Sequence, residues 1–239
     1  RCILNNTYDL FKPIILAAGL GSRMKSKTPK PLHKICGKEM ITMIIDSCAS
    51  AGLPQSITVV PYNFDDFKKV TQDRTQYVTQ KKANGSGDAL LQINQLHIPE
   101  NIIVLNSDVP LITDSTISEM ITSHIKSDAH ITLLTSIQPD NKGLGRILRN
   151  EKKDILDIIE ENDTDNKTSN ITEINVGVYC FKSSWVLKAI KELKPSKSGE
   201  VYLTDLINIA SSQNKTIASI MLENINEGLG LMIGLNWQN

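Results

Sequence analysis

Two glycines and two cations near the start of the chain form the first group of residues suited to chemistry. Gly19 and Gly21 follow the apolar run at 13–16, and Arg23 and Lys30 come soon after them. Backbone N–H groups of a glycine turn that follows a strand can close around phosphate oxygens. Arginine and lysine side chains neutralise the charge of a triphosphate. This group therefore predicts a nucleotide phosphate site.

Two familiar nucleotide-binding motifs do not fit this turn. The third glycine of a dinucleotide-binding G-x-G-x-x-G motif would fall at Met24, and the second strand ends at Val59 and Val60 without an acidic residue. The Gly-Lys-Ser/Thr of a P-loop is also missing. A nicotinamide-dependent oxidoreductase is thus a distant alternative.

Asp108 is the best metal-ligand candidate in the sequence. It follows the apolar run at 102–105, and ligands of open α/β sheets collect at the carboxyl ends of strands. Mg²⁺ usually takes one or two protein oxygens and completes its shell with water and substrate phosphates. One aspartate and one distant oxygen donor would therefore suffice for a magnesium site.

The elements that must position these residues predict an α/β protein. Short β-branched runs alternate with helical patterns, as in βα units around a largely parallel sheet. The expected strands are 13–16, 56–60, 76–79, 102–105 and 131–135, and the expected helices are 40–51, 88–96 and 116–125. Thr116 and Glu119 fit a capping box at the start of the last of these helices.

The pattern changes after Gly145, where strands follow one another without helices. These strands are expected at 146–149, 155–160 and 174–181, followed by helices at 184–193 and 201–210 and a last strand at 216–222. Neither a repeat nor a linker divides the sequence. One continuous domain over residues 1–239, with an α/β half and a β-rich half, is the simplest organisation.

Composition limits the classes of partner. The 239 residues contain 26 Lys and Arg and 26 Asp and Glu, so no overall positive field attracts nucleic acid or an anionic membrane. No apolar run reaches the roughly 20 residues that a transmembrane helix needs. The four cysteines form no CxxC pair, which favours reduced thiols and a cytoplasmic location.

The run from residue 16 to residue 38 closely resembles the signature of the sugar-1-phosphate nucleotidyltransferases. It reads Leu-Ala-Ala-Gly-Leu-Gly-Ser-Arg-Met at 16–24, then Pro-Lys-Pro-Leu-His at 29–33 and Gly-Lys at 37–38. Within that family it is most similar to the uridylyltransferases that act on N-acetylglucosamine-1-phosphate. Further matches follow in the family's order at 80–89, 106–111, 145–147, 158–160, 173–177, 199–205 and 233–236. The resemblance covers nearly the whole chain.

The resemblance implies a fold and a reaction. The fold would be the Rossmann-like nucleotide-diphospho-sugar transferase fold, a mixed and mostly parallel sheet with a β-rich sugar-binding lobe. Residues 13–111 would form the nucleotide-binding half and residues 112–239 the sugar-binding half. The reaction would be Mg²⁺-dependent transfer of a uridylyl group from UTP to a sugar-1-phosphate, giving UDP-N-acetylglucosamine, a precursor of bacterial peptidoglycan, and pyrophosphate. Self-association is not implied.

The resemblance also implies roles for particular residues. Arg23 and Lys30 would be the catalytic cations, and Asp108 and Asn236 the magnesium ligands. The nucleotide would contact Leu16, Ala17, Ala18, Gly19, Gly21, Ser22, Gln80, Gly85, Ser86, Asn106 and Ser107. The sugar phosphate would contact Gly145, Glu160, Asn175, Tyr202 and Thr204. The Gln80 amide carries both a donor and an acceptor, so it can complement N3–H and O4 of uracil.

Three departures from the family pattern stand out. Asp88 replaces a histidine near the nucleotide, where its charge is expected to weaken UTP binding unless it points away. Asn106 and Ser107 replace an aromatic residue and a glycine. Trp237-Gln238 follow Asn236 where a polar residue and an arginine are usual, and the segment 227–230 offers a competing alignment with no asparagine.

These departures leave two alternatives to the expected reaction. One is a nucleotidyltransferase for another sugar phosphate, such as glucose-1-phosphate, or for CTP. The other is a nucleotide-sugar sensor that binds without turnover. The hexapeptide repeats of the acetyltransferase β-helix, which the bifunctional members carry, are not found in the sequence, so no such domain is expected within it.

Overall fold

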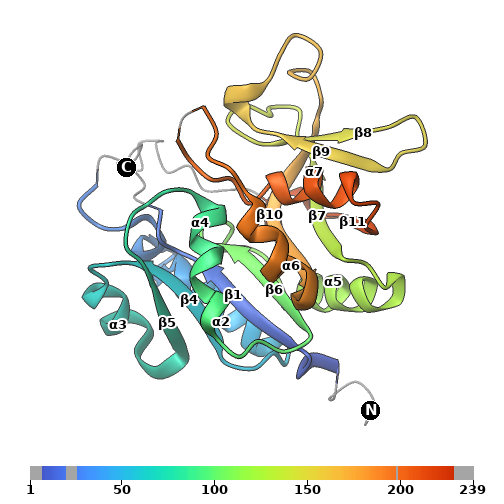
Figure 1. The fold of residues 1–239 in the computed structure, drawn as a ribbon. Coiled ribbons are helices and arrows are strands. Elements are labelled where there is room, and N and C mark those ends of the chain that lie inside the picture. Colours follow the sequence, from blue (N-terminus) through green and yellow to red (C-terminus); the bar gives the residue numbers. More distant parts are fainter. Residues whose placement is uncertain (1–6, 20–25, 198, 229–239) are drawn as a thin grey trace.

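A mostly parallel sheet forms the centre of the structure, a computed structural model that describes residues 7–19, 26–197 and 199–228 (Figure 1). Its strand order is β11-β7-β10-β6-β1-β4-β5. These strands are β1 (Phe11–Leu16), β4 (Ser56–Pro61), β5 (Thr75–Gln80), β6 (Asn101–Asn106), β7 (Ile131–Ile137), β10 (Glu173–Lys182) and β11 (Ile217–Met221). Only β10 runs antiparallel to its neighbours in this order. The prediction of an α/β fold with a mostly parallel sheet is confirmed.

Helices cover both faces of the sheet because residues along β1 alternate between two apolar clusters. Ile14 and Leu16 face one cluster, and Phe11 and Ile15 face the other. The first face is covered by α4 (Ser86–Leu91), α6 (Ser183–Ala189) and α7 (Asp205–Ser212). The second is covered by α2 (Met40–Ser50), α3 (Asp65–Thr71) and α5 (Asp114–Ser127). Both faces of the sheet are therefore covered by helices. This packing holds in place the strand ends that carry the site.

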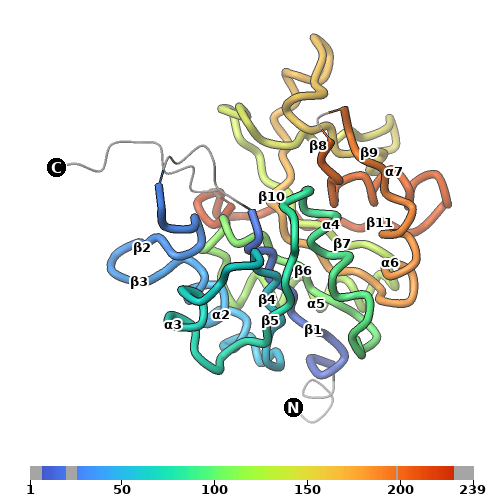
Figure 2. Tube along the Cα trace, turned by 60° about the vertical axis from the view of Figure 1, so that its left-hand side comes forward, coloured from blue at the N-terminus to red at the C-terminus, as the bar shows by residue number. Residues whose placement is uncertain are grey.

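The β-rich part is a hairpin at one end of the sheet. Strands β8 (Arg146–Arg149) and β9 (Ile155–Ile159) pair with each other, and β8 joins the sheet through the pair Ile174 and Arg146. Figures 1 and 2 show this hairpin standing above the sheet beside α7. The sequence predicted these strands and the lack of helices between them.

Several predicted boundaries are corrected by the structure. Thr113 caps α5, because its Oγ1 accepts a hydrogen bond from the Thr116 backbone N at 3.3 Å, so the predicted capping box at Thr116 is wrong. The predicted helix at 201–210 begins only at Asp205 because the Val201 backbone pairs with the loop at 84–87. Helix α3 and a small hairpin of β2 (Lys34–Ile35) and β3 (Lys38–Glu39) were not predicted from the sequence. The predicted helices at 88–96 and 184–193 end in 3₁₀ turns.

A buried histidine on α5 predicts how stability depends on pH. His124 is 1% exposed, its Nδ1 lies 2.8 Å from Thr132 Oγ1, and its Nε2 has no partner among the described residues. Burial and the nearby Lys182 and His130 lower its pKa to about 4, although Asp128 acts in the opposite direction. The unfolded chain, with an ordinary histidine pKa near 6.5, therefore binds this proton first. We expect the free energy of unfolding to fall by about 3 kcal/mol as the pH drops from about 6.5 to about 4.

Urea unfolding at a series of pH values measures this effect. His124→Asn keeps a polar group beside Thr132 but cannot titrate, so its stability should fall less over the same interval. The matched control is His97→Gln at an exposed histidine. If His124→Asn and the wild type have the same pH profile, the buried imidazole does not cause the loss.

Candidate active site

The end of β1, which precedes the predicted glycine turn, lies beside the end of β6, which precedes the metal-ligand candidate Asp108. Strands β1 and β6 are parallel neighbours with Leu16 opposite Asn106, and the Ser107 backbone N donates to Leu16 O at 3.1 Å. Ala17 and Ala18 are buried directly after β1. Gly19 is exposed, and nothing lies within 4 Å of the position that a Cβ would take there. Among the described residues, nothing therefore crowds the backbone at Gly19.

Lys30 forms an ion pair with Asp108. Its Nζ lies 3.1 Å from Asp108 Oδ2, and the two side chains are 18% and 42% exposed. Lys30 begins a 3₁₀ turn, Lys30–Leu32, that is fixed by the buried Pro31 and Leu32. The structure thus brings together a predicted catalytic cation and a predicted metal ligand that are 78 residues apart in the sequence.

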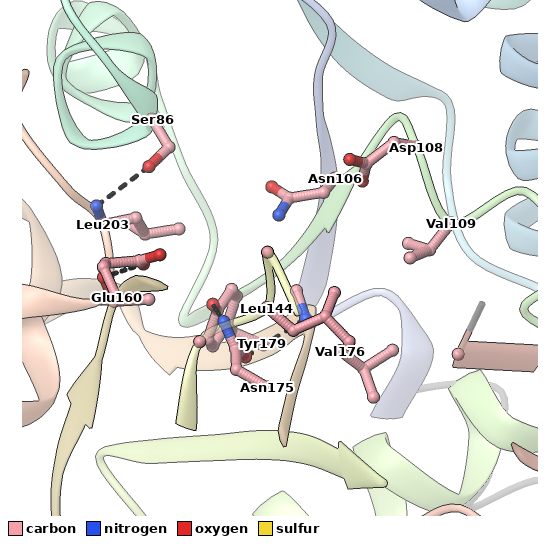
Figure 3. Close-up of a pocket in the computed structure, with 15 residues that line it drawn as sticks. Ser86, Asn106, Asp108, Val109, Leu144, Glu160, Asn175, Val176, Tyr179 and Leu203 are labelled. Atoms are coloured by element: carbon pink, nitrogen blue, oxygen red, sulfur yellow. Dashed lines mark hydrogen bonds between the residues drawn. The ribbon is translucent and has the colours of Figure 1, made fainter. Parts of the chain in front are cut away.

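A pocket of about 210 Å³ opens beside Asp108 (Figure 3). Asn106 and Asp108 lie on one side, and Glu160 and Leu203 lie on the opposite side. The predicted residues that line it are Ser86, Asn106, Asp108, Gly145, Glu160, Asn175 and Thr204. One cavity therefore joins side chains from the expected nucleotide half with side chains from the expected sugar half.

The polar side chains expected to contact the sugar are held by hydrogen bonds to their neighbours. Thr204 Oγ1 donates to Glu160 Oε1 at 2.7 Å. Asn175 Nδ2 donates to Tyr179 Oη at 2.6 Å, and Asn175 Oδ1 accepts from the Gly177 backbone N at 3.1 Å. Burial raises the pKa of Glu160, which the Thr204 hydrogen bond partly offsets. Burial also raises the pKa of Tyr179 far above its usual value, so its hydroxyl stays protonated.

A strand irregularity places Asn175 at the pocket. The pairing of β10 with β7 shifts between Asn175 and Tyr179, and Gly177 within this bulge has φ +86°. A Cβ at Gly177 would lie 2.4 Å from Asn106 Nδ2. Only glycine fits this close approach of β10 to the end of β6.

A buried arginine, Arg146, fixes the loop that contains Gly145. Arg146 is 3% exposed, its Nη1 donates to Leu144 O at 2.6 Å, and it forms an ion pair with Glu161. Glu161 Oε2 also accepts from the Gly143 backbone N at 2.8 Å. The backbone of this loop, which forms one wall of the pocket, is therefore anchored to the residue that follows Glu160.

The turn before α4 is clamped against the segment that carries Thr204. The Val201 backbone N donates to Asn84 O at 2.7 Å, and the Gly87 backbone N donates to Val201 O at 2.9 Å. The Leu203 backbone N donates to Ser86 Oγ at 3.0 Å. Gly85, with φ +106°, packs directly on the Val201 backbone. The expected nucleotide loop and the expected sugar segment thus form one unit.

Several predicted site residues are not brought to the pocket. Within the described part of the chain, the predicted residues that do not line it are Leu16, Ala17, Ala18, Gly19, Lys30, Gln80, Gly85, Ser107 and Tyr202. Gln80 and Gly85 instead lie together beside α4, where Gln80 Nε2 donates to Gly85 O at 3.1 Å. Four predicted residues lie outside the described residues: Gly21, Ser22, Arg23 and Asn236.

The last described segment also reaches the pocket. Gly228 lines it, and the preceding Glu227 accepts hydrogen bonds through Oε2 from Thr116 Oγ1 at 2.6 Å and Thr113 Oγ1 at 3.1 Å. The N-terminal end of α5 thereby anchors the chain just before residues 229–239.

Sequence reasoning missed the residues that line the pocket through backbone or apolar surface. These are Val109, Gly143, Leu144, Val176, Gly177, Tyr179, Leu203 and Gly228. Glycines and aliphatic residues occur throughout the chain, so their residue types do not mark them as pocket residues. They are recognised only in the structure, through the bulge in β10 and the loop fixed by Arg146. Tyr179 follows Asn175 by four residues, a weak signal that sequence alone could have offered.

The donor set at the pocket fits a hard divalent cation. Asp108 and Asn106 supply oxygens, the ligand atoms that Mg²⁺ prefers. Lys30 pairs with only one of the two Asp108 oxygens. No group of three or more His, Cys, Asp or Glu side chains suited to holding a metal occurs in residues 7–19, 26–197 and 199–228. An ion here would depend on substrate phosphates for the rest of its coordination shell, as Mg²⁺ commonly does.

Comparisons with known proteins place the chain among its relatives. The bifunctional protein GlmU of Limosilactobacillus fermentum is 37% identical over 221 residues, covering 91% of this chain and 49% of that protein. GlmU of Bacillus subtilis is 35% identical, with 91% and 48% covered. The chain therefore spans about half the length of the curated relatives it matches.

A solved structure agrees in fold. UDP-glucose pyrophosphorylase complexed with UDP-glucose superposes with a TM-score of 0.74 at 18% identity, covering 91% of this chain and 93% of that one. The model of the nucleotidyl transferase family matches residues 12–237, which include every strand of the central sheet except the first residue of β1. The chain belongs to the nucleotidyl transferase family.

Proposed function

We propose that the protein transfers a uridylyl group from UTP to N-acetylglucosamine-1-phosphate, giving UDP-N-acetylglucosamine and pyrophosphate. The observation that carries this proposal is the single pocket in which Asp108 faces Glu160, Asn175 and Thr204. A carboxylate, an amide and a hydroxyl can pair the hydroxyl and acetamido groups of a sugar once these are buried. The GlmU relatives support the proposal, and the resemblance described from the sequence supports the choice of sugar and nucleotide.

The reaction needs no general base from the protein. An anionic oxygen of the sugar-1-phosphate forms a bond to the α-phosphorus of UTP, and the bond from that phosphorus to the β-phosphate oxygen breaks to release pyrophosphate. The protein's task is to align the two phosphates and to offset their charge. Lys30, with Arg23, would stabilise the triphosphate and the leaving pyrophosphate.

Asp108 would hold Mg²⁺, and Asn236 is the second donor proposed from the sequence. When bound, the ion supplies Lewis-acid stabilisation of the charge on phosphate oxygens. Glu160, Asn175 and Thr204 would orient the sugar so that its phosphate points toward Asp108. Gly145 would contact the sugar phosphate from the pocket wall, where its carbonyl accepts a hydrogen bond from the Asn175 backbone N at 2.8 Å and keeps a second lone pair.

A cytoplasmic location and a role in cell-wall precursor synthesis belong to the same proposal. UTP and sugar phosphates are cytoplasmic metabolites, and Cys36, Cys48 and Cys180 are free thiols. None of the helices in the described ranges is long and apolar enough to cross a membrane. Neither nucleic acid nor a membrane is a proposed partner.

The test is release of pyrophosphate in the presence of Mg²⁺, with N-acetylglucosamine-1-phosphate and each nucleoside triphosphate in turn. The series is repeated with glucose-1-phosphate. We expect release with UTP and the acetylated sugar, at a rate at least tenfold above every other pair. Faster release with glucose-1-phosphate would change the assigned sugar. No release from folded protein that still binds UDP-N-acetylglucosamine would favour the sensor alternative.

A further inference from the structure

The Gln80 amide is held in one orientation by two acceptors. Gln80 ends β5 and is 4% exposed, and its Nε2 lies 2.6 Å from Asp88 Oδ2 and 3.1 Å from Gly85 O. A carboxylate and a backbone carbonyl can only accept hydrogen bonds. The two hydrogens of Nε2 are therefore both used. Rotating the amide by 180° would place its oxygen against two acceptors.

The other end of this amide can still accept a hydrogen bond. No residue in the described ranges donates to Gln80 Oε1, and this oxygen is not among the fully buried side-chain atoms of those residues that lack a partner, so it keeps some access to solvent. A ligand that donates here would satisfy this acceptor. Gln80 therefore offers a ligand one acceptor and no donor. From this orientation we expect it to accept from N3–H of uracil only, whereas the prediction from the sequence was that it would complement both N3–H and O4.

Uracil and cytosine differ at the atom that such an acceptor would meet. Uracil carries a hydrogen on N3, whereas N3 of cytosine is a bare acceptor. A glutamine amide that can rotate serves either base, because rotation exchanges its oxygen for its NH₂ group. A glutamine amide that cannot rotate accepts from uracil N3 and leaves cytosine N3 facing another lone pair. Fixing the amide thus adds repulsion between the glutamine oxygen and cytosine N3, which disfavours binding of cytosine.

We propose that Asp88 is a positioning residue that locks Gln80 with its oxygen toward the nucleobase and so makes the site reject CTP. The inference rests on the proposed function and on the role in reading the base that the family resemblance implies for Gln80. It also accounts for the departure at Asp88. The Asp88 carboxylate points to the Gln80 amide and accepts a hydrogen bond from it through Oδ2. Asp88 can therefore lie near the nucleotide without contacting the phosphates.

The test compares kcat/KM for UTP and for CTP in wild type and Asp88→Ala, with the same sugar-1-phosphate and Mg²⁺. We expect the UTP-to-CTP ratio to fall about tenfold, as for loss of one hydrogen bond to a charged group. In a Gln80→Ala background, Asp88→Ala should leave the ratio unchanged, because there is no amide left to fix. The matched control is Asp114→Ala, which removes a first-turn acid from α5.

A merely structural role of Asp88 in the first turn of α4 would lower the unfolding temperature and reduce kcat/KM for both nucleotides alike. If Asp88→Ala does not fold, Asp88→Asn decides the question, because its amide has the same size but can donate as well as accept. An unchanged ratio in a folded Asp88 variant of a UTP-selective enzyme would overturn the inference and leave the proposed function standing. A wild type that releases no pyrophosphate with UTP would overturn both.

Discussion

Asp108→Asn should reduce kcat/KM for uridylyl transfer roughly 10³-fold with the fold retained. The substitution keeps the size of the side chain but removes the charge that Mg²⁺ would require and that Lys30 Nζ contacts at 3.1 Å. Because Asp108 is 42% exposed, loss of this ion pair should cost little stability. Pyrophosphate release at saturating and limiting Mg²⁺ measures the first effect, and thermal unfolding measures the second.

The matched control is Asp73→Asn, at an exposed carboxylate before β5 and thus at the opposite edge of the sheet. Full activity in Asp108→Asn would remove the metal assignment. Asn236→Ala, in parallel, tests the second donor. A large rise in the Mg²⁺ concentration needed for half-maximal rate would support Asn236, whereas an unchanged requirement would support the alignment at 227–230.

Gly85→Ala should be the most damaging small substitution in the loop at 84–87. A Cβ at this position would lie 2.4 Å from Val201 O and 2.8 Å from Val201 N, and φ is +106°. The loop must therefore separate from Val201 and lose the backbone hydrogen bonds of 2.7 and 2.9 Å that clamp it. We expect a loss of about 3 kcal/mol in unfolding free energy, from strain together with broken contacts. Turnover should fall at least tenfold, because Ser86 and Thr204 lose their relative placement.

Gly52→Ala separates the two causes of this loss. Gly52 has φ +83°, yet nothing lies within 4 Å of its missing Cβ. It should lose only about 1 kcal/mol, from backbone strain alone, and keep full activity. Urea unfolding of both variants gives the comparison. Equal losses would show that the contact with Val201 contributes nothing.

The strand ends that carry the site could be predicted from the sequence, because short β-branched apolar runs stop where polar, charged or glycine residues begin. Asp108 follows such a run, and the family motif marks Lys30, so their association at the carboxyl edge follows from a parallel sheet. Gly145, Glu160, Asn175 and Thr204 also meet in one pocket, as the motif order suggested. Their roles in binding remain predictions.

What the sequence could not reveal depends on contacts between distant segments. The start of α7 is delayed to Asp205 because Val201 pairs with residues 84–87, and no local propensity records that pairing. The orientation of the Gln80 amide depends on Asp88, eight residues away across a turn. At α5, Thr113 and Thr116 both suit a cap, and the Glu227 carboxylate that contacts both lies more than 100 residues later. Local patterns cannot choose between such alternatives.

The place of β10 in the sheet bears on how substrates enter and leave. This strand is hydrogen-bonded to β6, whose end carries Asn106, and to β7 and β8, while its own Asn175 lines the pocket. The two expected halves therefore share one continuous sheet, which a hinge motion between them would have to break. We expect ligands to enter and leave this pocket through movement of loops and of the β8–β9 hairpin, while the sheet keeps its shape.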